Sequence, residues 1–316
     1  MKNHTAIIIG GTGQFGIILS QLLLKKKYKI FITSRYNKKI IKLRKEYSRV
    51  NFVKLNIYKK NEIKKILNKI DPKLVFFFAG QSSPQLSFKK KKETFQSNYI
   101  GCKNVLEEIK KNNSNIKFLN AASSEMYGHI KNKISLRTIK KPLNPYGVAK
   151  KKSFDLVKEY REKFKMNNYN AILFNSESYL RDKNFIIAKI CIAAINAHKF
   201  RKKTQINNIL VSREWNWCEE QCDLLLKFLK KKPQDFILSN GKSFSIKQML
   251  KFAFEFFNLN FYDFIIVKNK KLKKNEVKYK KSNFKESLKK NNLISKNKIY
   301  GKKLIHKMLK FYLDEK

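Results

Sequence analysis

Short apolar runs alternate with amphipathic stretches over the first half of the chain. The run Thr5–Ile9 is mostly apolar and strand-sized, and the stretch after Gly16 repeats apolar residues at helical spacing through Leu24. Apolar positions three and four residues apart form one face of a helix, whereas a short continuous apolar run is typical of a buried strand. The chain therefore begins with a predicted strand, a glycine-rich loop and a predicted helix.

The same alternation continues to residue 174. Further predicted strands are Lys29–Thr33, Asn51–Leu55, Leu74–Phe78, Lys117–Asn120 and Ala171–Phe174. Predicted helices are Lys38–Tyr47, Asn61–Ile70, Phe95–Lys110 and Lys150–Phe164, the last entered at Pro145. Strands that alternate with helices are typical of a parallel sheet covered on both faces. The predicted fold class is α/β, a Rossmann-type doubly wound parallel sheet.

The pattern changes after Asn175. Predicted elements there are a helix at Phe185–Ala197, a strand and loop at Leu210–Trp217, one more strand of the sheet at Asp235–Leu238 and an aromatic-rich helix at Phe244–Phe257. We therefore predict a nucleotide-binding domain over 1–175 with a returning segment at about 218–240. A smaller mixed α/β substrate-binding domain is predicted over most of 176–316.

The chain is strongly basic, since 72 Lys and Arg against 23 Asp and Glu give a formal net charge of +49. Such a charge ordinarily suggests a nucleic acid or an anionic membrane surface as partner. The lysines are spread over the whole chain, however, and they come with abundant Asn, Ile, Phe and Tyr, whose codons are AT-rich. A biased genome is the simpler cause, so we expect no nucleic-acid or membrane partner. The lysine-rich run Lys268–Lys290, with Glu276 inside it, is expected on the surface.

Apolar runs and cysteines indicate the cellular setting. No apolar run approaches the roughly twenty residues of a membrane-spanning helix, and no signal-peptide pattern is visible, so a cytoplasmic location is expected. Of the four cysteines, Cys218 and Cys222 are closely spaced but have no histidine near them, and the set shows no metal-site pattern. We interpret the cysteines as reduced thiols of the core.

A glycine-rich loop, GGTGQFG, occupies residues 10–16 between the first predicted strand and helix. In such a loop Gly10 permits a tight turn, Gly13 lets the backbone approach a pyrophosphate, and Gly16 lets the helix pack closely on the strand. The N–H groups at the helix start then face the phosphates. A plain strand-to-helix turn is the alternative. The residues expected to hold a dinucleotide here are Gly10, Thr12, Gly13, Gln14, Phe15 and Gly16.

Arg35 follows the second predicted strand, where an acidic residue would receive the ribose hydroxyls of NAD. An arginine without a neighbouring carboxylate suits the extra phosphate of NADP, so we expect NADP in preference to NAD. The alternative is one more solvated base in a basic chain. Ala79 and Gln81 follow the apolar strand Leu74–Phe78 and are expected to line the cofactor.

Tyr146 and Lys150 are four residues apart on a predicted helix, which places both side chains on one face. A nearby ammonium lowers the pKa of a phenol, so Tyr146 is a candidate base for a sugar or alcohol hydroxyl. The same spacing recurs elsewhere in this lysine-rich chain and by itself means little. What distinguishes this pair is Pro145, which suits a helix start, the small Gly147, and a Ser-Ser-Glu cluster that ends the preceding apolar strand.

Several segments together resemble the extended short-chain dehydrogenase/reductase family of nucleotide-sugar epimerases and dehydratases, and most closely its GDP-mannose 4,6-dehydratase branch. The segments are GGTGQFG at 10–16, ASSEMYG at 122–128, PYGVAK at 145–150, LFNSES at 173–178 and SREW at 212–215. The resemblance covers most of the chain.

The resemblance implies specific roles. Ser123 would hydrogen-bond the reacting sugar hydroxyl, Tyr146 would be the base for oxidation, and Lys150 would support it and hold the nicotinamide ribose. Glu125 would take the proton from the fifth carbon during elimination, and Asn56 would lie near the adenine. The residues expected to contact substrate are Ser82, Ser123, Asn175, Glu177, Arg181, Asn184, Lys189 and Arg213. A homodimer through the helices Phe95–Lys110 and Lys150–Phe164 is also implied.

The chain departs from that family at several positions. Ser123 replaces a threonine and keeps the hydroxyl, whereas Asn56 replaces an aspartate near the adenine. Ser176, Tyr179–Leu180 and Lys273–Lys278 replace residues of the substrate loops. These changes preserve the chemistry and leave the sugar nucleotide open. A shortened loop after Arg35 puts a tetramer built on that loop in question.

The leading hypothesis is a dehydratase acting on GDP-mannose with tightly held, internally recycled NADP. The first alternative is an epimerase or dehydratase for another nucleotide sugar, although Glu125 favours dehydration. The second is a binding protein that kept the fold and uses its charge for RNA.

Overall fold

The structure, a computed structural model, describes residues 4–112, 115–269, 271–272 and 277–314. The described residues form two compact units. Unit 1 is drawn from Met1–Gly128, Leu136–Leu173 and Cys222–Leu238. Unit 2 is drawn from His129–Ser135, Phe174–Gln221 and Ser239–Lys316.

Unit 1 is built on a parallel sheet. Among the described residues seven strands pair in the order β11-β6-β5-β4-β1-β2-β3. Their bounds are β1 Thr5–Ile9, β2 Lys29–Ser34, β3 Asn51–Lys54, β4 Leu74–Phe77, β5 Lys117–Ser123, β6 Asn168–Leu173 and β11 Asp235–Leu238. Strand order reverses between β1 and β4, and ligands of open α/β sheets bind at such switch points, beyond the carboxyl ends of the strands. The α/β fold class predicted from the sequence is confirmed.

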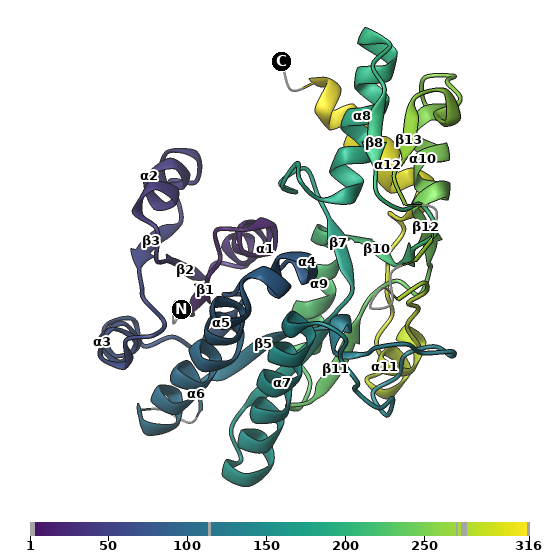
Figure 1. The fold of residues 1–316 in the computed structure, drawn as a ribbon. Helices are drawn as coiled ribbons and strands as arrows, with labels where there is room; N and C mark the ends of the chain where they lie inside the picture. The colour runs from purple at the N-terminus through teal and green to yellow at the C-terminus, as the bar shows by residue number, and fades with distance from the viewer. Residues whose placement is uncertain (1–3, 113–114, 270, 273–276, 315–316) are drawn as a thin grey trace. The chain divides into compact units, whose positions relative to one another are not determined.

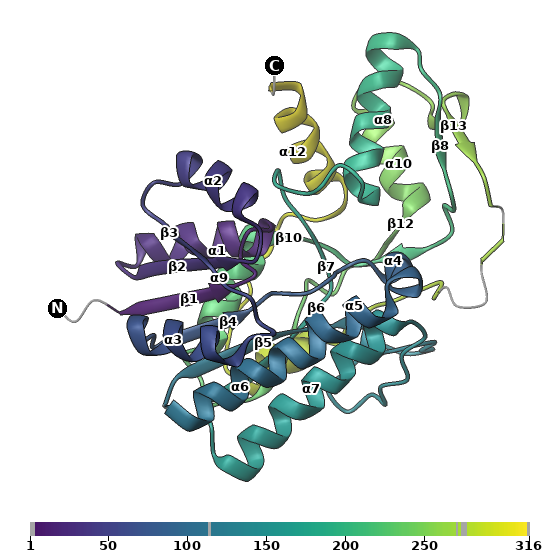
Figure 2. The same cartoon turned by 60° about the vertical axis from the view of Figure 1, so that its left-hand side comes forward.

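Helices cover both faces of this sheet (Figures 1 and 2). Helices α3, α6 and α7 contribute to one core with alternate residues of β1 and β4, Ile7, Ile9, Val75 and Phe77. Helices α1 and α9 lie on the opposite face, where Cys222 of α9 contacts Phe15 of α1. The bounds are α1 Gln14–Lys25, α2 Asn37–Glu46, α3 Lys60–Ile70, α4 Pro84–Lys89, α6 Gly101–Asn112, α7 Pro145–Phe164 and α9 Cys218–Phe228.

The single helix predicted over Phe95–Lys110 is wrong in detail. The structure has α5 Lys91–Phe95, a π-helical turn Gln96–Ile100 and then α6. Asn98, in the π turn, donates its side-chain amide to the backbone oxygens of Gln81 and Thr94, each at 3.0 Å. The turn is thereby tied to the segment that follows β4. Such turns occur frequently at functional sites.

Unit 2 contains short two-stranded ladders and a helical core. The ladders pair β7 Asn175–Glu177 with β10 Trp215–Trp217, β8 Thr204–Ile206 with β13 Ile265–Val267, and β9 Ser212–Arg213 with β12 Phe244–Ser245. Helices α8 Ile186–Phe200, α10 Ile246–Glu255 and α12 Gly301–Asp314 share one apolar core. The helix α11 Phe284–Lys290 and two 3₁₀ turns, Ser124–Met126 in unit 1 and Phe261–Asp263 in unit 2, complete the described elements.

Several predicted boundaries are corrected. Strand β5 runs to Ser123 rather than Asn120. The predicted helix from Phe244 begins two residues later, because Ser245 caps it with a capping box while Phe244–Ser245 pairs with β9. Leu210–Trp217 divides into β9 and β10.

The described part of the lysine-rich run Lys268–Lys290 is mostly exposed or half-buried, as expected, but it contains buried positions. Val277, Lys280 and Ser282 are buried. The backbone N–H and the hydroxyl of Ser282 donate to the carboxylate of Glu214, which is itself 0% exposed. These buried positions anchor the run to unit 2. Glu276 and the rest of 273–276 lie outside the described residues.

Two further findings concern cysteines and membranes. All four cysteines are buried, and none forms a disulfide. Within the described ranges, every helix is too short or too polar to cross a bilayer.

Candidate active site

The glycine-rich loop joins β1 to α1 at the carboxyl edge of the sheet in unit 1. Gly10 has φ +72°, and a Cβ added there would clash with the backbone of Ala79 after β4. Its N–H donates to the oxygen of Thr33 at 3.1 Å, which ties the loop to β2. Only glycine meets both requirements, positive φ and close backbone approach.

Gly13 and Gly16 differ in their surroundings. A Cβ added at Gly13 would meet no described atom within 4 Å, so this face of the loop is open. Gly13 is also the N-cap of α1 and has no side chain with which to cap the helix. Gly16 packs against the backbone of Gly11, just past the end of β1, so an added Cβ would clash there. An uncapped helix start behind an open glycine is a ready anion site.

Buried polar atoms without partners gather beyond β4. Among the described residues, Gln81 Oε1, Thr94 Oγ1 and Asn98 Oδ1 are buried and accept or donate no hydrogen bond. A buried polar atom left unpaired is costly, so such atoms indicate a missing polar partner. With the open Gly13 and the uncapped α1, these residues fit a dinucleotide.

Arg35 and Asn56 follow β2 and β3. The Arg35 guanidinium hydrogen-bonds the Tyr36 hydroxyl and lies 3.0 Å from Glu93 Oε1 of α5. The Asn56 side chain accepts the N–H of Tyr58 at 3.1 Å. The sequence next to Arg35 contains no carboxylate. The carboxylate that pairs with Arg35 is that of Glu93, which is on α5 and 58 residues away in the sequence.

Ser123 and Glu125 lie where β5 ends. Ser123 Oγ accepts the N–H of Glu125 at 3.1 Å and is 8% exposed. Glu125 Oε2 accepts the side-chain amide of Asn144 at 2.9 Å, while Asn144 Oδ1 caps α7 by accepting the N–H of Gly147 at 2.8 Å. One amide therefore joins the carboxylate to the helix that bears Tyr146 and Lys150.

The first turns of α7 approach the β5 end closely. A Cβ at Gly147 would clash with the backbone oxygen of Glu125, so glycine is required there. Lys150 is 5% exposed, donates to the oxygen of Ala121 at 2.8 Å, and lies 5.7 Å from the centre of the Tyr146 ring. Burial lowers the pKa of Lys150 to about 8. These contacts place Ser123 and Glu125 at the end of β5 next to the first turns of α7, which carry Tyr146 and Lys150. Their catalytic roles stay predictions.

The lowered Lys150 pKa has a measurable effect on stability. The folded protein releases the Lys150 proton near pH 8, whereas the unfolded chain holds it to about the ordinary value of 10.5. The unfolded state binds more protons in this window, so the free energy of unfolding rises with pH. We expect the wild type to gain about 2 kcal/mol over Lys150→Met between pH 7.5 and pH 10. Urea unfolding of both proteins measures it, and parallel curves would contradict the predicted protonation change.

The remaining predicted substrate residues divide between the units. Ser82 is exposed after β4 in unit 1. The others belong to unit 2, where Glu177 is 1% exposed and pairs with Arg181 Nε at 3.2 Å. Burial raises the pKa of Glu177 to about 7. The Arg181 guanidinium lies 3.5 Å from the centre of the Phe185 ring.

Other unit 2 candidates are less constrained. Asn175 is half-buried in β7, and Asn184 and Lys189 are exposed. Arg213 donates to the backbone oxygen of Ser212 at 2.8 Å. These contacts leave the substrate roles of the unit 2 residues as predictions.

Two residues next to the predicted site, Asn144 and Glu93, were not predicted from the sequence. Asn144 had a usable signal, because asparagine directly before a proline at a helix start is a strong N-cap pattern. The hydrogen bond from Asn144 to Glu125 has no local signal in the sequence. The contact of Glu93 with Arg35 has no such signal either, since 58 residues separate the two.

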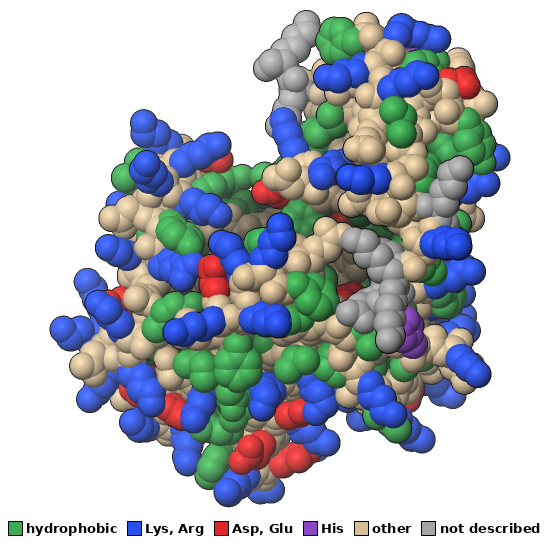
Figure 3. Space-filling view, in the orientation of Figure 1, with side chains coloured by type: hydrophobic (Ala, Val, Ile, Leu, Met, Phe, Trp, Pro, Cys, Tyr) green, Lys and Arg blue, Asp and Glu red, His purple; other side chains and the backbone are tan. Residues whose placement is uncertain are grey.

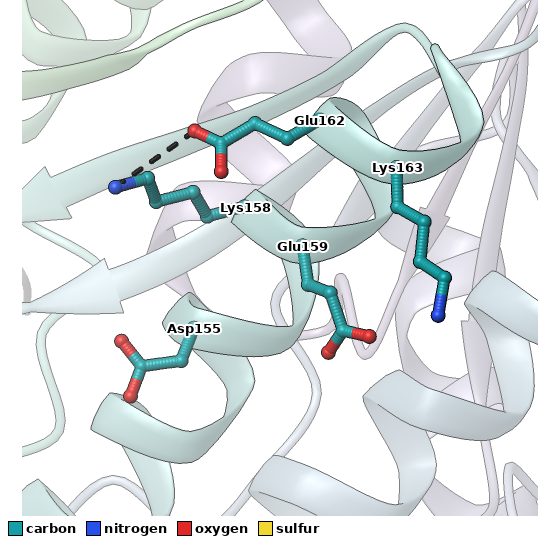
Figure 4. A pocket seen from close by; sticks show the side chains of 5 residues that line it. All are labelled: Asp155, Lys158, Glu159, Glu162 and Lys163. Carbon is teal, nitrogen blue, oxygen red and sulfur yellow. Dashed lines mark ion pairs between the residues drawn. The ribbon is translucent and has the colours of Figure 1, made fainter.

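A surface depression on α7 is not part of this site. Figure 4 shows its five lining side chains, all charged and all from the later turns of α7: Asp155, Lys158, Glu159, Glu162 and Lys163. Lys158 and Glu162 form an ion pair at 3.8 Å. All the side chains that line it carry a charge and none is a predicted site residue, whereas a ligand site usually has hydrophobic and aromatic side chains with a few placed polar groups. Within the described ranges, no cluster of His, Cys, Asp or Glu could hold a metal ion.

The family of this chain is shown by its similarity to known proteins. The sequence model of the GDP-mannose 4,6 dehydratase family matches residues 7–304. The chain belongs to the GDP-mannose 4,6-dehydratase family. GDP-mannose 4,6 dehydratase 2 of Caenorhabditis elegans is 30% identical over 270 residues, which are 80% of this chain and 70% of that protein. GDP-mannose 4,6 dehydratase 1 of Arabidopsis thaliana is 28% identical over 291 residues, 86% of this chain and 80% of that one.

Solved structures of two nucleotide-sugar enzymes have a fold similar to that of this member of the GDP-mannose 4,6-dehydratase family. The UDP-glucose 4-epimerase of Thermus thermophilus, in complex with NAD, has a TM-score of 0.85 at 13% identity and covers 99% of this chain and 100% of its own. The dTDP-glucose 4,6-dehydratase of Bacillus anthracis, also with NAD, has a TM-score of 0.84 at 15% identity, covering 99% and 97%. At such identities the likeness supports the fold alone.

Proposed function

We propose that this chain dehydrates GDP-mannose to the 4-keto-6-deoxy sugar nucleotide with tightly held NADP. Family membership supports the reaction class. The observation that carries the proposal is the Glu125 carboxylate, which Asn144 holds at 2.9 Å beside the helix start that bears Tyr146 and Lys150. An oxidation requires one base, and elimination of water across the next carbons requires a second.

The proposed roles follow from position and protonation. The Tyr146 phenol takes the proton of the sugar's 4-hydroxyl, and the Lys150 ammonium, fixed on the Ala121 oxygen, favours the phenolate. The Ser123 hydroxyl hydrogen-bonds the same sugar oxygen. Once the fourth carbon is a ketone, the hydrogen on the fifth becomes acidic and Glu125 removes it as a proton. The C6–O bond then breaks, and the hydroxyl of the sixth carbon leaves as water with the proton that Glu125 took up. A nicotinamide held beside these groups would supply the hydride acceptor for the fourth carbon and the hydride donor for the sixth.

The cofactor and substrate assignments are parts of the same proposal. Gly10, Thr12, Gly13, Gln14, Phe15 and Gly16 hold the pyrophosphate, while Asn56, Ala79 and Gln81 line the adenosine and nicotinamide ends. Arg35 holds the extra phosphate of NADP. Ser82, Asn175, Glu177, Arg181, Asn184, Lys189 and Arg213 hold the sugar nucleotide. We keep the cytoplasmic location as a prediction.

We also propose a homodimer through the segments Phe95–Lys110 and Lys150–Phe164, as the family resemblance implies. Aromatic residues support it, because Phe95 at the end of α5, Tyr99 in the π turn, and Tyr160 and Phe164 on α7 are only half-buried. Light scattering at working concentration measures the mass, and a monomer would remove the idea.

An RNA-binding role has less support. Figure 3 shows Lys and Arg side chains scattered over the visible face of both units, interspersed with apolar and acidic ones, and not gathered in one patch. A nucleic-acid site ordinarily concentrates its bases on one face or stripe.

A panel of sugar nucleotides tests the proposal. Purified protein is incubated with GDP-mannose and with other nucleotide hexoses, and mass spectrometry searches for products lighter by one water. We expect a 4-keto-6-deoxy product from GDP-mannose. A product from another nucleotide sugar alone would move the substrate assignment and keep the class, whereas an epimer of unchanged mass would overturn the class.

Asn144 is expected to position Glu125, and a substitution that adds a negative charge at Asn144 tests this role. Asn144→Asp keeps the cap on Gly147 but places a second carboxylate against Glu125. Adjacent carboxylates favour protonation of one of them, so activity at neutral pH should fall about tenfold and the acid limb of the pH profile should move to higher pH. Asn144→Ser, which keeps a cap without the added charge, is the control and should move the acid limb less than Asn144→Asp does, because it removes only the hydrogen bond to Glu125. An unmoved limb in Asn144→Asp would contradict the contact.

A further inference from the structure

Arg35 is already neutralised in this structure. Its guanidinium lies 3.0 Å from Glu93 Oε1, and the two side chains are 38% and 37% exposed. Glu93 is on α5 and also pairs through Oε2 with Lys90 at 3.3 Å. The single carboxylate therefore lies between two cations, one of which is the proposed phosphate anchor.

Glu93 remains charged at neutral pH. Hydrogen bonds from Lys90 and then from Arg35 outweigh partial burial and hold the pKa of Glu93 below its usual range. An anionic phosphate that approaches Arg35 thus meets a full negative charge at hydrogen-bond distance from the same guanidinium. Like charges at such a separation repel, and the repulsion is only partly screened at this exposure.

We propose that Glu93 determines cofactor specificity by competing with the extra phosphate of NADP for Arg35. This inference rests on the proposed function, since it takes Arg35 as the phosphate anchor. NADP binding requires the Arg35–Glu93 pair to open, after which Glu93 keeps its contact with Lys90. NAD carries a hydroxyl at that position and leaves the pair intact. Glu93 thus lowers the ratio of NADP binding to NAD binding below the ratio that Arg35 alone would give.

The test measures which dinucleotide the protein holds. Wild type and Glu93→Gln are equilibrated with equal concentrations of NADP and NAD, separated from free cofactor and denatured, and the released dinucleotides are quantified by mass spectrometry. An exposed ion pair changes a binding constant by about two- to fivefold, so we expect the NADP to NAD ratio to rise about two- to fivefold in Glu93→Gln. Titrations with 2′,5′-ADP and 5′-AMP should show tighter binding of the first only.

Two further variants separate competition from a general charge effect. Glu107→Gln removes the same charge from α6, where Glu107 pairs with Lys60 at 2.6 Å, and should leave the ratio unchanged. Arg35→Ala should lower the ratio, and Glu93→Gln added to it should have no further effect.

Each other outcome overturns the inference in a distinct way. A ratio that is unchanged or lower in Glu93→Gln contradicts the competition. A ratio raised through weaker 5′-AMP binding makes Glu93 a ribose contact instead. Wild-type protein that holds no dinucleotide under these conditions contradicts the proposed function together with the inference, whereas failure of dehydratase activity leaves this readout intact.

Discussion

Glu125→Gln is expected to oxidise its substrate once and then stop. Glutamine is nearly isosteric and keeps an oxygen to accept the Asn144 amide, 2.9 Å away in the wild type, but it cannot take up a proton. Loss of a positioned base costs about 10²–10⁴-fold in rate, so the keto-deoxy product should fall by that factor. Reduced nicotinamide should accumulate to about one equivalent per subunit because the step that consumes it is blocked.

Two measurements check this expectation. Nicotinamide absorbance during a single turnover follows the oxidation, and mass spectrometry follows the product. Glu159→Gln, at an exposed position of α7, is the matched control and should behave as wild type. A Glu125→Gln enzyme with near-normal product formation would refute Glu125 as the elimination base.

Tyr146→Phe is expected to stop the reaction one step earlier. The ring keeps its place near Lys150, 5.7 Å from the ammonium in the wild type, so only the phenolic hydroxyl is lost. Without that base the 4-hydroxyl keeps its proton and the oxidation cannot begin, so product should again fall by about 10²–10⁴-fold. The difference from Glu125→Gln is that no reduced nicotinamide should appear.

The comparison of the two variants separates their roles. Both should bind GDP-mannose and unfold at wild-type urea concentrations, because neither substitution removes buried apolar area. If Tyr146→Phe accumulated reduced nicotinamide, the first proton would leave through another group and the assignment of Tyr146 would be wrong.

Local patterns predicted most of unit 1 because each signal lies within a few residues. The apolar run Thr5–Ile9 and the glycines at 10, 13 and 16 define a strand, loop and helix by themselves. The Tyr146–Lys150 spacing is likewise contained in one helical turn. The alternation of strands and helices predicts a doubly wound parallel sheet, whereas the order of its strands came from the structure.

Features that depend on distant partners were not visible in the sequence. The π turn at Gln96–Ile100 adds one residue to a helical period, too small a change to see in apolar spacing. Ser282 is buried beside Glu214, which is 68 residues away in the sequence. Lys280 is buried as well, although a lysine-rich composition predicts exposure. Ladders of two or three residues in unit 2 are too short to leave a periodic pattern.

The fate of one hydrogen tests the central claim most directly. GDP-mannose carrying deuterium on the fourth carbon of the mannose is incubated with the purified protein, and the product is examined by mass spectrometry and NMR. Dehydration with an internally recycled cofactor predicts a 4-keto-6-deoxy product whose deuterium lies in the methyl group at the sixth carbon. Deuterium retained on the fourth carbon of a hexose epimer, with no water lost, would contradict it.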